Sequence, residues 1–374
     1  MESNFPPPLR GALIGAGGVT EHHLRAWQHI PNVVIIAIAD PQLEHARTRA
    51  EQFGITQVFA YAAALLDANL ALDFVDIASP PQFHCEQTLL AAARGLHVLC
   101  QKAFATNLAQ ARAMIRVCER AGVILCINEN WRWRAWYRAI KRMLAEGKIG
   151  EPTYVRFFGH GEYHVPSRPG YRRAWLLELG RGNLYEWGIH HIDVARFLLG
   201  EPETVYARLT RINQDVPNED HALVLLTFGD ATALIDISSA SYAPYGHPNR
   251  ETSVVEDFRI EGDAGTLALI PDPVRGDLIR VTTADGEIET RAYDGAPYDA
   301  YLQSYIAAQS HFIECVRTGH SPETNGADNF KTFAAMLAAY RSAESNAVIR
   351  IQDFIAQESA NQLPNHLIAQ LHPE

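Results

Sequence analysis

The chain has 374 residues, and at about 150 residues per domain this length predicts two domains or three. Apolar residues make up 47% of the sequence and charged residues 20%, which is ordinary for a globular protein and excludes collagen-like and disordered chains. The formal net charge of −11 disfavours binding to nucleic acid and to anionic membranes, because an acidic chain repels phosphate.

The cysteines and the first residues bear on the cellular compartment. The five cysteines are widely spaced and form no CxxC pair, which fits reduced thiols and not a disulfide framework or a zinc site. The opening MESNFPPP has an acid and three prolines where a signal peptide needs a basic region and an apolar run. The apolar run at 33–39 is far shorter than the ~20 residues that span a bilayer. We therefore expect a cytoplasmic protein without a membrane partner.

Short apolar runs alternate with amphipathic stretches of helical length in the first part of the chain. Candidate strands lie at 9–15, 33–39, 74–78, 97–100 and 123–127. Candidate helices lie between them, at 19–30, 43–53, 82–94 and 107–121. Parallel strands are apolar throughout when helices cover both faces of their sheet. The pattern predicts repeated βαβ units, and with them an α/β domain, over residues 1–130.

The pattern changes after residue 130. A helix at 135–146 is followed by alternating strands such as 153–159 and by a hairpin at 223–238, whose strands are joined by a Gly-Asp turn. Two late helical stretches, 300–318 and 326–344, are expected to complete this domain. We therefore predict a second, α+β domain with an antiparallel sheet over 131–351, and a C-terminal tail over 352–374.

A glycine-rich turn directly follows the first strand. Gly15 permits a tight bend, Gly17 allows the backbone to approach a pyrophosphate, and the helix that follows offers its unpaired N–H groups. Thr20 replaces the third glycine of the usual GxGxxG pattern, which we expect to loosen the contact between helix and strand. The turn alone is also compatible with an ordinary strand-to-helix connection.

Asp40 lies at the end of the second strand, where dinucleotide-binding folds place the acid that binds the adenosine ribose. A carboxylate there repels a 2′-phosphate, and the next three residues offer no cation to neutralise one. The sequence therefore favours NAD over NADP. The alternative for Asp40 is a simple Asp-Pro turn after a strand.

Several strings together resemble the Gfo/Idh/MocA oxidoreductase family. They are GAGGVTEHHLRAW at 15–27, SPPQFH at 79–84, GLHVLCQK at 95–102, KRMLAEGKIGEPTYVRF at 141–157, GRGNLYEWGIHHID at 180–193 and SPETNGAD at 321–328. The resemblance implies an N-terminal NAD-binding Rossmann domain and a C-terminal α+β domain with a large, mostly antiparallel open sheet. It also implies hydride transfer on a sugar, sugar acid or cyclitol, and a homo-oligomer, a dimer or tetramer formed through the C-terminal sheet.

The resemblance also implies a set of cofactor-binding residues. They are Gly15, Gly17, Gly18, Val19, Asp40, Ser79, Pro80, His84, Gln101 and Lys102. Where the family has the string EKP, this chain keeps Lys102 but has Gln101 and Ala103 beside it. The substitutions remove a charge near the cofactor and a proline that would stiffen the turn.

A helical segment at 183–199 carries the candidate catalytic residues. At ~100° per residue, Glu186, His190 and Asp193 form one narrow polar stripe, which is either a solvated helix face or part of a site. The family pattern DxGxHxxD favours a site. We expect His190 to act as general base, Lys102 to stabilise the developing alkoxide, and Glu186 to orient one of them. Asp193 is expected to bind substrate hydroxyls.

Aromatic and basic residues alternate over 131–138. The acidic net charge argues against single-stranded nucleic acid as their ligand, although such segments can stack on bases. Family position predicts that Trp131 and Arg132 bind substrate, together with Tyr163 and Trp175, while plain packing of these rings is an equal alternative.

Histidines are numerous, and adjacent or i,i+4 pairs occur at 190–191 and at 160 and 164. None of these pairs completes a ligand set at a known metal-binding spacing, so we expect no metal. Two other functions stay open beside an NAD-dependent dehydrogenase. One is a redox-assisted lyase or glycosidase that recycles its NAD, and the other is a non-catalytic NAD-binding regulatory protein.

Overall fold

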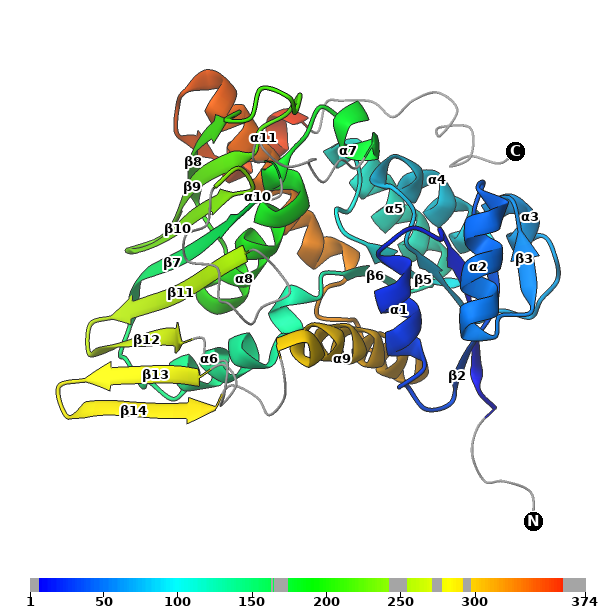
Figure 1. Cartoon of the computed structure of the whole chain (residues 1–374), viewed down its shortest axis with the longest axis horizontal. Helices are drawn as coiled ribbons and strands as arrows, with labels where there is room; N and C mark the ends of the chain where they lie inside the picture. Colours follow the sequence, from blue (N-terminus) through cyan, green and yellow to red (C-terminus); the bar gives the residue numbers. More distant parts are fainter. Residues whose placement is uncertain are drawn as a thin grey trace, which may run out of the picture. The chain divides into compact units, whose positions relative to one another are not determined.

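The computed structural model describes residues 7–358 apart from 163, 165–173, 242–253, 271–277 and 292–296 (Figure 1). The chain divides into two compact units. The first unit contains the described residues up to Asn130 together with Leu302–Phe330, and the second contains the described residues of Trp131–Tyr301 and of Lys331–Glu358. The sequence pattern predicts both late helices in the second domain, whereas in the structure Leu302–Phe330 belongs to the first unit.

Six parallel strands form the sheet of the first unit, in the order β3-β2-β1-β4-β5-β6. The strands are β1 (Leu9–Ile14), β2 (Val33–Ala39), β3 (Gln57–Phe59), β4 (Phe74–Ile77), β5 (His97–Gln101) and β6 (Leu125–Asn128). The connecting helices are α1 (Thr20–Trp27), α2 (Leu43–Phe53), α3 (Ala62–Leu66), α4 (Pro81–Ala92) and α5 (Leu108–Ala121). The strand order reverses between β1 and β4, the place where sheets of this kind bind ligands at the carboxyl ends of their strands. This confirms the predicted Rossmann architecture.

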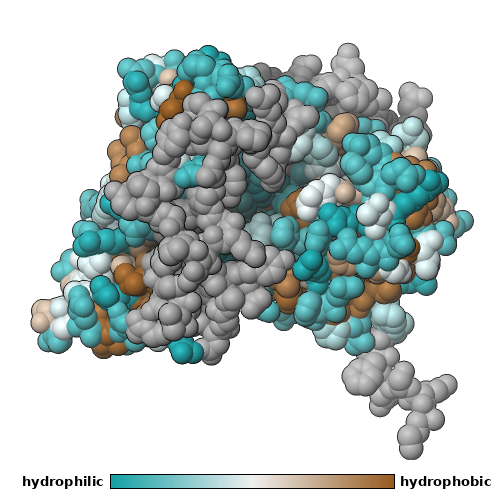
Figure 2. All heavy atoms as spheres, in the orientation of Figure 1, coloured by the Kyte–Doolittle hydropathy of each residue, from teal (hydrophilic) through white to brown (hydrophobic). Residues whose placement is uncertain are grey.

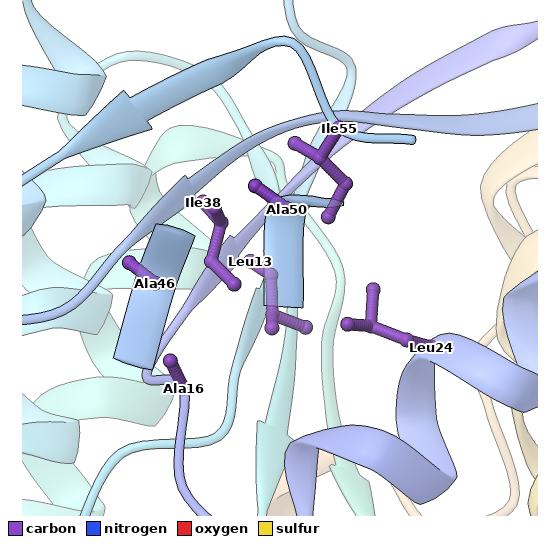
Figure 3. Close-up of a cluster of buried hydrophobic side chains, with 7 residues drawn as sticks. All are labelled: Leu13, Ala16, Leu24, Ile38, Ala46, Ala50 and Ile55. Carbon is purple, nitrogen blue, oxygen red and sulfur yellow. The ribbon is translucent and has the colours of Figure 1, made fainter. Parts of the chain in front are cut away.

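Small residues allow a helix to lie close to one side of this sheet. Leu13 and Ile38 project from adjacent strands toward Ala46 and Ala50 of α2, and all four are at most 5% exposed (Figure 3). An alanine on the helix leaves room for a branched side chain on the strand, so the two layers interdigitate at the density of a protein interior.

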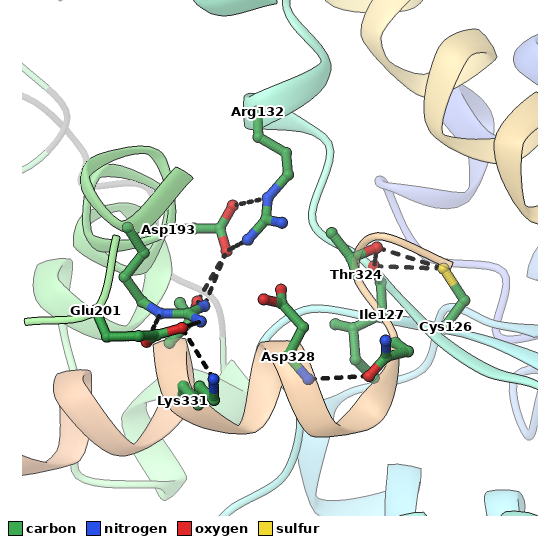
Figure 4. Close-up of polar contacts among 11 residues, drawn as sticks. Cys126, Ile127, Arg132, Asp193, Glu201, Thr324, Asp328 and Lys331 are labelled. Carbon is green, nitrogen blue, oxygen red and sulfur yellow. Dashed lines mark hydrogen bonds and ion pairs between the residues drawn. The ribbon is translucent and has the colours of Figure 1, made fainter. Parts of the chain in front are cut away.

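Most of the late helix α9 (Pro297–Thr318) belongs to the first unit because it packs against the parallel sheet. Phe312 and Ile313 pack with Phe74 and Leu99 in a buried cluster below the parallel sheet. The hydroxyl of Thr324 donates a 2.7 Å hydrogen bond to the carbonyl oxygen of Ile127, which ties the segment after α9 to β6 (Figure 4). The apolar face of α9 therefore covers a sheet formed nearly 200 residues earlier in the chain.

Nine strands form the sheet of the second unit, in the order β14-β13-β12-β11-β7-β10-β9-β8-β15. The strands are β7 (Pro152–Gly161), β8 (Thr204–Thr210), β9 (His221–Phe228), β10 (Ala231–Ser238), β11 (Val254–Gly262), β12 (Gly265–Ile270), β13 (Leu278–Thr283), β14 (Gly286–Arg291) and β15 (Ile349–Arg350). Strands β7 and β10 pair in parallel and the other neighbours are antiparallel. The predicted large, mostly antiparallel sheet is confirmed.

Helical elements complete the second unit. They are η1 (Trp131–Trp133), α6 (Ala135–Ala145), α7 (Ala174–Glu178), the π-helical turn η2 (Leu184–Gly188), α8 (Ile189–Leu199), α10 (Gly326–Ser345), whose first residues belong to the first unit, and α11 (Ile351–Glu358). Side chains alternate along β7 and β10, so that Phe157 and Ile235 are buried while Phe158 and Asp236 are half-buried on the other face.

Hydrophilic residues cover most of the described surface on the face of the molecule that Figure 2 draws. Within the described ranges, no helix combines the length and the apolar character needed to cross a lipid bilayer.

Candidate active site

The glycine turn after β1 requires glycine at its first position. Gly15 has φ +106°, and a Cβ there would lie 2.7–2.8 Å from backbone atoms of Ala78 and Ser79. A Cβ added at Gly17 or Gly18 would meet no atom within 4 Å. The turn is therefore held tightly against β4 at Gly15, while the next two glycines leave backbone accessible to a ligand.

Thr20, the first residue of α1, binds back to the start of this turn. Its side chain is fully buried, and its hydroxyl donates a 3.1 Å hydrogen bond to the carbonyl oxygen of Gly15. This hydrogen bond joins the first residue of α1 to the residue that follows β1, which speaks against the expected loosening of the contact between helix and strand. Its hydroxyl supplies a hydrogen bond that the third glycine of the usual pattern cannot make.

Asp40 holds the glycine turn from the end of β2. Its Oδ2 accepts a 2.7 Å hydrogen bond from the amide of Ala16, and its Oδ1 accepts one of 2.8 Å from the amide of Gln42. Each carboxylate oxygen has a further lone pair, so these bonds leave capacity for ribose hydroxyls.

His84 joins the turn after β4 to the segment after β5. Its Nε2 lies 2.8 Å from the carbonyl oxygen of Ser79, and its Nδ1 lies 3.1 Å from that of Ala103. Burial lowers the pKa of His84, although the neighbouring carbonyl groups oppose this shift. The fully buried ring therefore braces the backbone of two loops, and Pro80 directly precedes α4 between them.

Gln101 fixes the backbone of Lys102 at the carboxyl end of β5. The side-chain oxygen of Gln101 accepts a 2.6 Å hydrogen bond from the amide of Lys102. Its amide nitrogen lies 3.2 Å from Nε2 of His23, and Nδ1 of His23 lies 2.9 Å from Oδ2 of Asp76. Because the Gln101 amide donates, His23 accepts at Nε2 and donates from Nδ1 to the carboxylate.

Two further donors complete this buried network. The indole N–H of Trp27 donates to Oδ2 of Asp76 at 2.7 Å, and the side-chain amide of Asn128 lies 3.4 Å from Nε2 of His23. His23 and Asp76 are fully buried. A chain of side chains from α1, β4 and β5 thus ends at the main chain of Lys102, which is half-buried.

Glu219 supports the start of the segment that carries His190. Its Oε1 accepts hydrogen bonds from the amide of Gly182 at 2.9 Å and from the hydroxyl of Tyr340 at 2.5 Å. A Cβ at Gly182 would lie 1.9 Å from the carbonyl oxygen of Glu219, so only glycine fits there. Burial raises the pKa of Glu219, while these hydrogen bonds favour its ionised form.

His190 is the second residue of α8 and stacks on an aromatic ring. The rings of His190 and Trp131 are 4.6 Å apart and 6° from parallel, and the guanidinium carbon of Arg134 lies 3.8 Å from the centre of the Trp131 ring. Trp131 and His190 are 5% and 6% exposed. Trp131 is therefore already engaged with protein side chains, which favours the packing alternative for this ring.

The next residue, His191, lies among aromatic rings. Its ring centre is 5.4 Å from that of Phe157 and 5.7 Å from that of Trp187. Burial, with smaller contributions from His190 and Arg134, lowers the pKa of His191 to about 3. His191 is therefore uncharged at neutral pH.

Arg132 and Asp193 bind each other (Figure 4). Two parallel hydrogen bonds of 2.7 and 2.6 Å join the guanidinium to the two carboxylate oxygens, and Thr332 donates a third of 2.8 Å to Oδ1. Asp193 is 0% exposed and Arg132 is 4% exposed. Bidentate pairs of this kind fix geometry strongly, and here they join η1 to α8.

The predicted polar stripe is not one continuous helix face. The spacing of ~100° per residue holds only for a regular α-helix. Residues 184–188 instead form a π-helical turn, which has more residues per turn and changes the directions of the side chains. Glu186 is half-buried, whereas Asp193 points into the interior. Trp175 lies half-buried on α7, and Tyr163 lies outside the described residues.

The network residues His23, Asp76, Glu219 and Thr332 were not recognised from the sequence. They come from separate elements and share no spacing motif. One local signal was the replacement of glutamate by Gln101 in the family string, because an amide at this place can donate a hydrogen bond as well as accept one.

Comparisons with known proteins agree with this architecture. Residues 9–129 match an oxidoreductase family with an NAD-binding Rossmann fold, and residues 137–268 match the GFO/IDH/MocA C-terminal domain. The D-apiose dehydrogenase of Paraburkholderia graminis is 36% identical over 356 residues, which cover 94% of this chain and 92% of the relative. The myo-inositol 2-dehydrogenase of Thermotoga maritima is 26% identical and covers 93% of this chain and 100% of the relative.

A solved structure is similar over the same length. It is an oxidoreductase from Agrobacterium radiobacter in complex with NAD+, L-tartaric acid and magnesium. The sequence identity is 34%, the TM-score is 0.81, and the match covers 92% of this chain and 99% of the other.

Proposed function

The chain belongs to the Gfo/Idh/MocA oxidoreductase family, and from this premise we propose that it is a dehydrogenase that oxidises a hydroxyl group of a sugar with NAD. The family, fold, enzyme class and NAD cofactor that the sequence predicts are confirmed. Relatives named for apiose and for inositol indicate small polyhydroxylated substrates.

The substrate proposal depends on one observation, the 36% identity to a D-apiose dehydrogenase along nearly the whole of both chains. A match of this length includes both the cofactor domain and the sheet domain that follows it. D-Apiose is therefore the first substrate to test, and inositols come second because their dehydrogenases are more distant in sequence.

Asp40 supports NAD as the preferred dinucleotide. The carboxylate is fixed beside the glycine turn by the amides of Ala16 and Gln42, so it cannot turn away from a bound ribose without losing two hydrogen bonds. A 2′-phosphate at that ribose would meet a negative charge. The open backbone at Gly17 and Gly18 fits the pyrophosphate.

Bound NAD supplies the hydride acceptor, and the protein must bind the alcohol and remove its proton. We propose that Lys102 places its ammonium group on the reacting oxygen, since it directly follows β5 at the ligand-binding edge of the sheet. His190 takes the hydroxyl proton as general base. Stacking on Trp131 fixes the plane of the imidazole, which limits the directions in which it can accept that proton.

The pairing of Arg132 with Asp193 assigns these two residues a positioning role. Each satisfies the other, so neither has to bind substrate. Together they fix α8, which carries His190, relative to η1, which carries the stacking partner Trp131. Glu186 stays our candidate for orienting His190 or Lys102, and Trp175 for binding substrate. Assembly into a dimer or tetramer through the nine-stranded sheet also stays a prediction.

The test supplies a panel of candidate substrates and measures the formation of NADH by its absorbance. D-Apiose, D-xylose, myo-inositol, scyllo-inositol and a sugar acid are each supplied with NAD and with NADP. The proposal expects stoichiometric NADH with D-apiose or another sugar and a strong preference for NAD. A product formed without net NADH would favour the redox-assisted lyase, and binding of NAD without turnover of any substrate would favour the regulatory protein.

A further inference from the structure

Two histidines and an aspartate meet on the nine-stranded sheet of the second unit. His160 lies on β7, His221 on β9 and Asp236 on β10, the strand between the other two. Ser238 of β10 pairs with both His160 and His221, and Asp236 lies two residues before it on the same face. Sheet register therefore brings the three side chains together.

The three polar groups converge on one point. Oδ1 of Asp236 lies 2.9 Å from Nε2 of His160 and 3.1 Å from Nε2 of His221. One ligand atom from each residue lies within 4.8 Å of the other two. Both imidazoles thus direct the same nitrogen toward a single carboxylate oxygen, and all three side chains are between 23% and 28% exposed.

Neighbouring groups hold the ring of His160 in an orientation that suits cation binding. The hydroxyl of Ser241 lies 2.9 Å from Nδ1 of His160, so it can hold the ring with Nε2 directed toward Asp236. The ring of Phe158 stacks on His160 at 4.0 Å and restricts its rotation.

We propose that His160, His221 and Asp236 bind one divalent transition-metal ion of the Zn²⁺ type. Two imidazole nitrogens and one carboxylate oxygen are a ligand set that suits zinc and its neighbours, whereas Mg²⁺ and Ca²⁺ prefer oxygen ligands alone. Three protein ligands leave at least one coordination position for water. The contact between His160 and Ser241 is the kind of outer-shell hydrogen bond that orients a metal-binding histidine.

The proposed metal site takes no part in the proposed hydride transfer. A bound ion would instead affect the stability of the second unit. An ion held by β7, β10 and β9 would join three adjacent strands and stabilise the folded second unit by mass action. The sequence alone predicts no metal site, because a recognisable ligand spacing needs residues close together in the chain. The three ligands are instead 76 and 15 residues apart and are related only by sheet register.

Zinc binding to the tag-free full-length chain tests the proposal directly. After treatment with a chelator and its removal, equilibrium dialysis against Zn²⁺ should give one ion per chain with low-micromolar affinity or better. His221→Gln and Asp236→Asn should each weaken binding about 100-fold, while His320→Gln, at an exposed histidine of the first unit, should leave it unchanged. Zinc should raise the melting temperature of the wild type by about 5 °C, and millimolar Mg²⁺ should not displace it.

Two results would overturn the site. One is wild-type protein that binds no Zn²⁺ at micromolar concentrations, and the other is binding that is equal in wild type, His221→Gln and Asp236→Asn. Cobalt substitution of the wild type provides a second measurement that needs no variant. A visible absorption band of low-symmetry Co²⁺ at one equivalent is expected, and a spectrum identical to aqueous Co²⁺ would contradict the proposal even if the variants failed to fold.

Discussion

The side-chain amide nitrogen of Gln101 lies 3.2 Å from Nε2 of His23, while the oxygen of the same amide accepts the main-chain N–H of Lys102 at 2.6 Å. An amide can donate and accept at once, whereas an ionised carboxylate can only accept. The glutamine that replaces the family's glutamate therefore matches the histidine beside it. The pair connects the buried Asp76 to the backbone of the proposed catalytic lysine.

The first prediction concerns Gln101→Glu. The carboxylate would face the acceptor nitrogen of His23, so either the histidine changes its proton arrangement or the hydrogen bond is lost. We expect the free energy of unfolding to fall by about 1–3 kcal/mol, the cost of an unsatisfied buried polar group. We expect kcat/KM to fall about tenfold or more, because small displacements of a catalytic group are costly. Urea unfolding and steady-state kinetics measure the two effects.

Gln52→Glu is the matched control for this substitution, since Gln52 lies on the surface and accepts a hydrogen bond from Arg49. The double variant His23→Gln with Gln101→Glu should recover part of the stability, because glutamine at position 23 can donate to the new carboxylate. Wild-type stability and kinetics in Gln101→Glu itself would show that the network does not position Lys102.

The second prediction concerns Asp193→Ala. The substitution leaves the guanidinium of Arg132 buried without its carboxylate, and breaking a buried pair in this way costs about 3–5 kcal/mol. The double variant Arg132→Met with Asp193→Leu should be clearly more stable than the single variant. Glu44→Ala, which breaks an exposed ion pair with Arg47, should change stability little. A raised KM with unchanged stability in Asp193→Ala would instead restore the substrate-binding role.

The third prediction concerns pH and His191. Its pKa falls from an ordinary value of 6.5 in the unfolded chain to about 3 in the buried site. Between these values the unfolded state binds a proton that the folded state does not, so stability is complete above the higher value and falls with pH below it. The expected slope is about 1.4 kcal/mol per pH unit.

His191→Phe removes this titration and keeps a ring among its aromatic neighbours. Urea unfolding at pH 7, 6 and 5 should show a shallower loss of stability in the variant than in the wild type. The buried His84 contributes in the same direction in both proteins, so some acid sensitivity remains. Parallel stability curves for the two proteins would mean that the His191 site admits a proton.

Local patterns explain what the sequence could and could not predict. Unbroken apolar runs and the glycine turn identified five of the six strands of the parallel sheet, because these signals lie within a few residues. The sixth, β3, was not predicted, since it has only three residues and no apolar run. The π-helical turn before His190 has no spacing signal of its own, and Glu219, which binds the backbone at its start, lies far away in the chain. The burial of Asp193 was missed for a similar reason, since a helical wheel shows periodicity but not the arginine that lies opposite.

The fourth prediction concerns Asp40→Asn. The amide oxygen can still accept from the amide of Ala16, so the contact with the glycine turn is kept, while the amide NH2 group cannot accept from Gln42 and that hydrogen bond is lost. The negative charge that repels a 2′-phosphate is lost, and we expect kcat/KM with NADP to rise about tenfold while that with NAD falls. Asp67→Asn, at a surface ion pair with Arg94, is the control. Unchanged relative use of the two dinucleotides would show that Asp40 only supports the turn.

The last prediction tests the two proposed catalytic groups together. Lys102→Ala and His190→Ala should each lower kcat by about 10²–10⁴-fold, the usual contribution of a positioned acid or base. If both groups act on one hydroxyl, the double variant should be hardly slower than the worse single variant, because residues that act as a unit are not additive. Lys102→Arg should not restore activity, since a guanidinium differs in shape and in its donors.

The pH profile separates a base from a structural residue. In the wild type, log kcat/KM should rise with pH through the titration of the base and then level off, and His190→Ala should lose this limb and regain part of its rate with added imidazole. Each variant must also bind NAD with near wild-type affinity, measured by fluorescence quenching, to exclude a damaged cofactor site. Fully additive losses in the double variant, or an unchanged acid limb in His190→Ala, would show that Lys102 and His190 do not share the reacting oxygen.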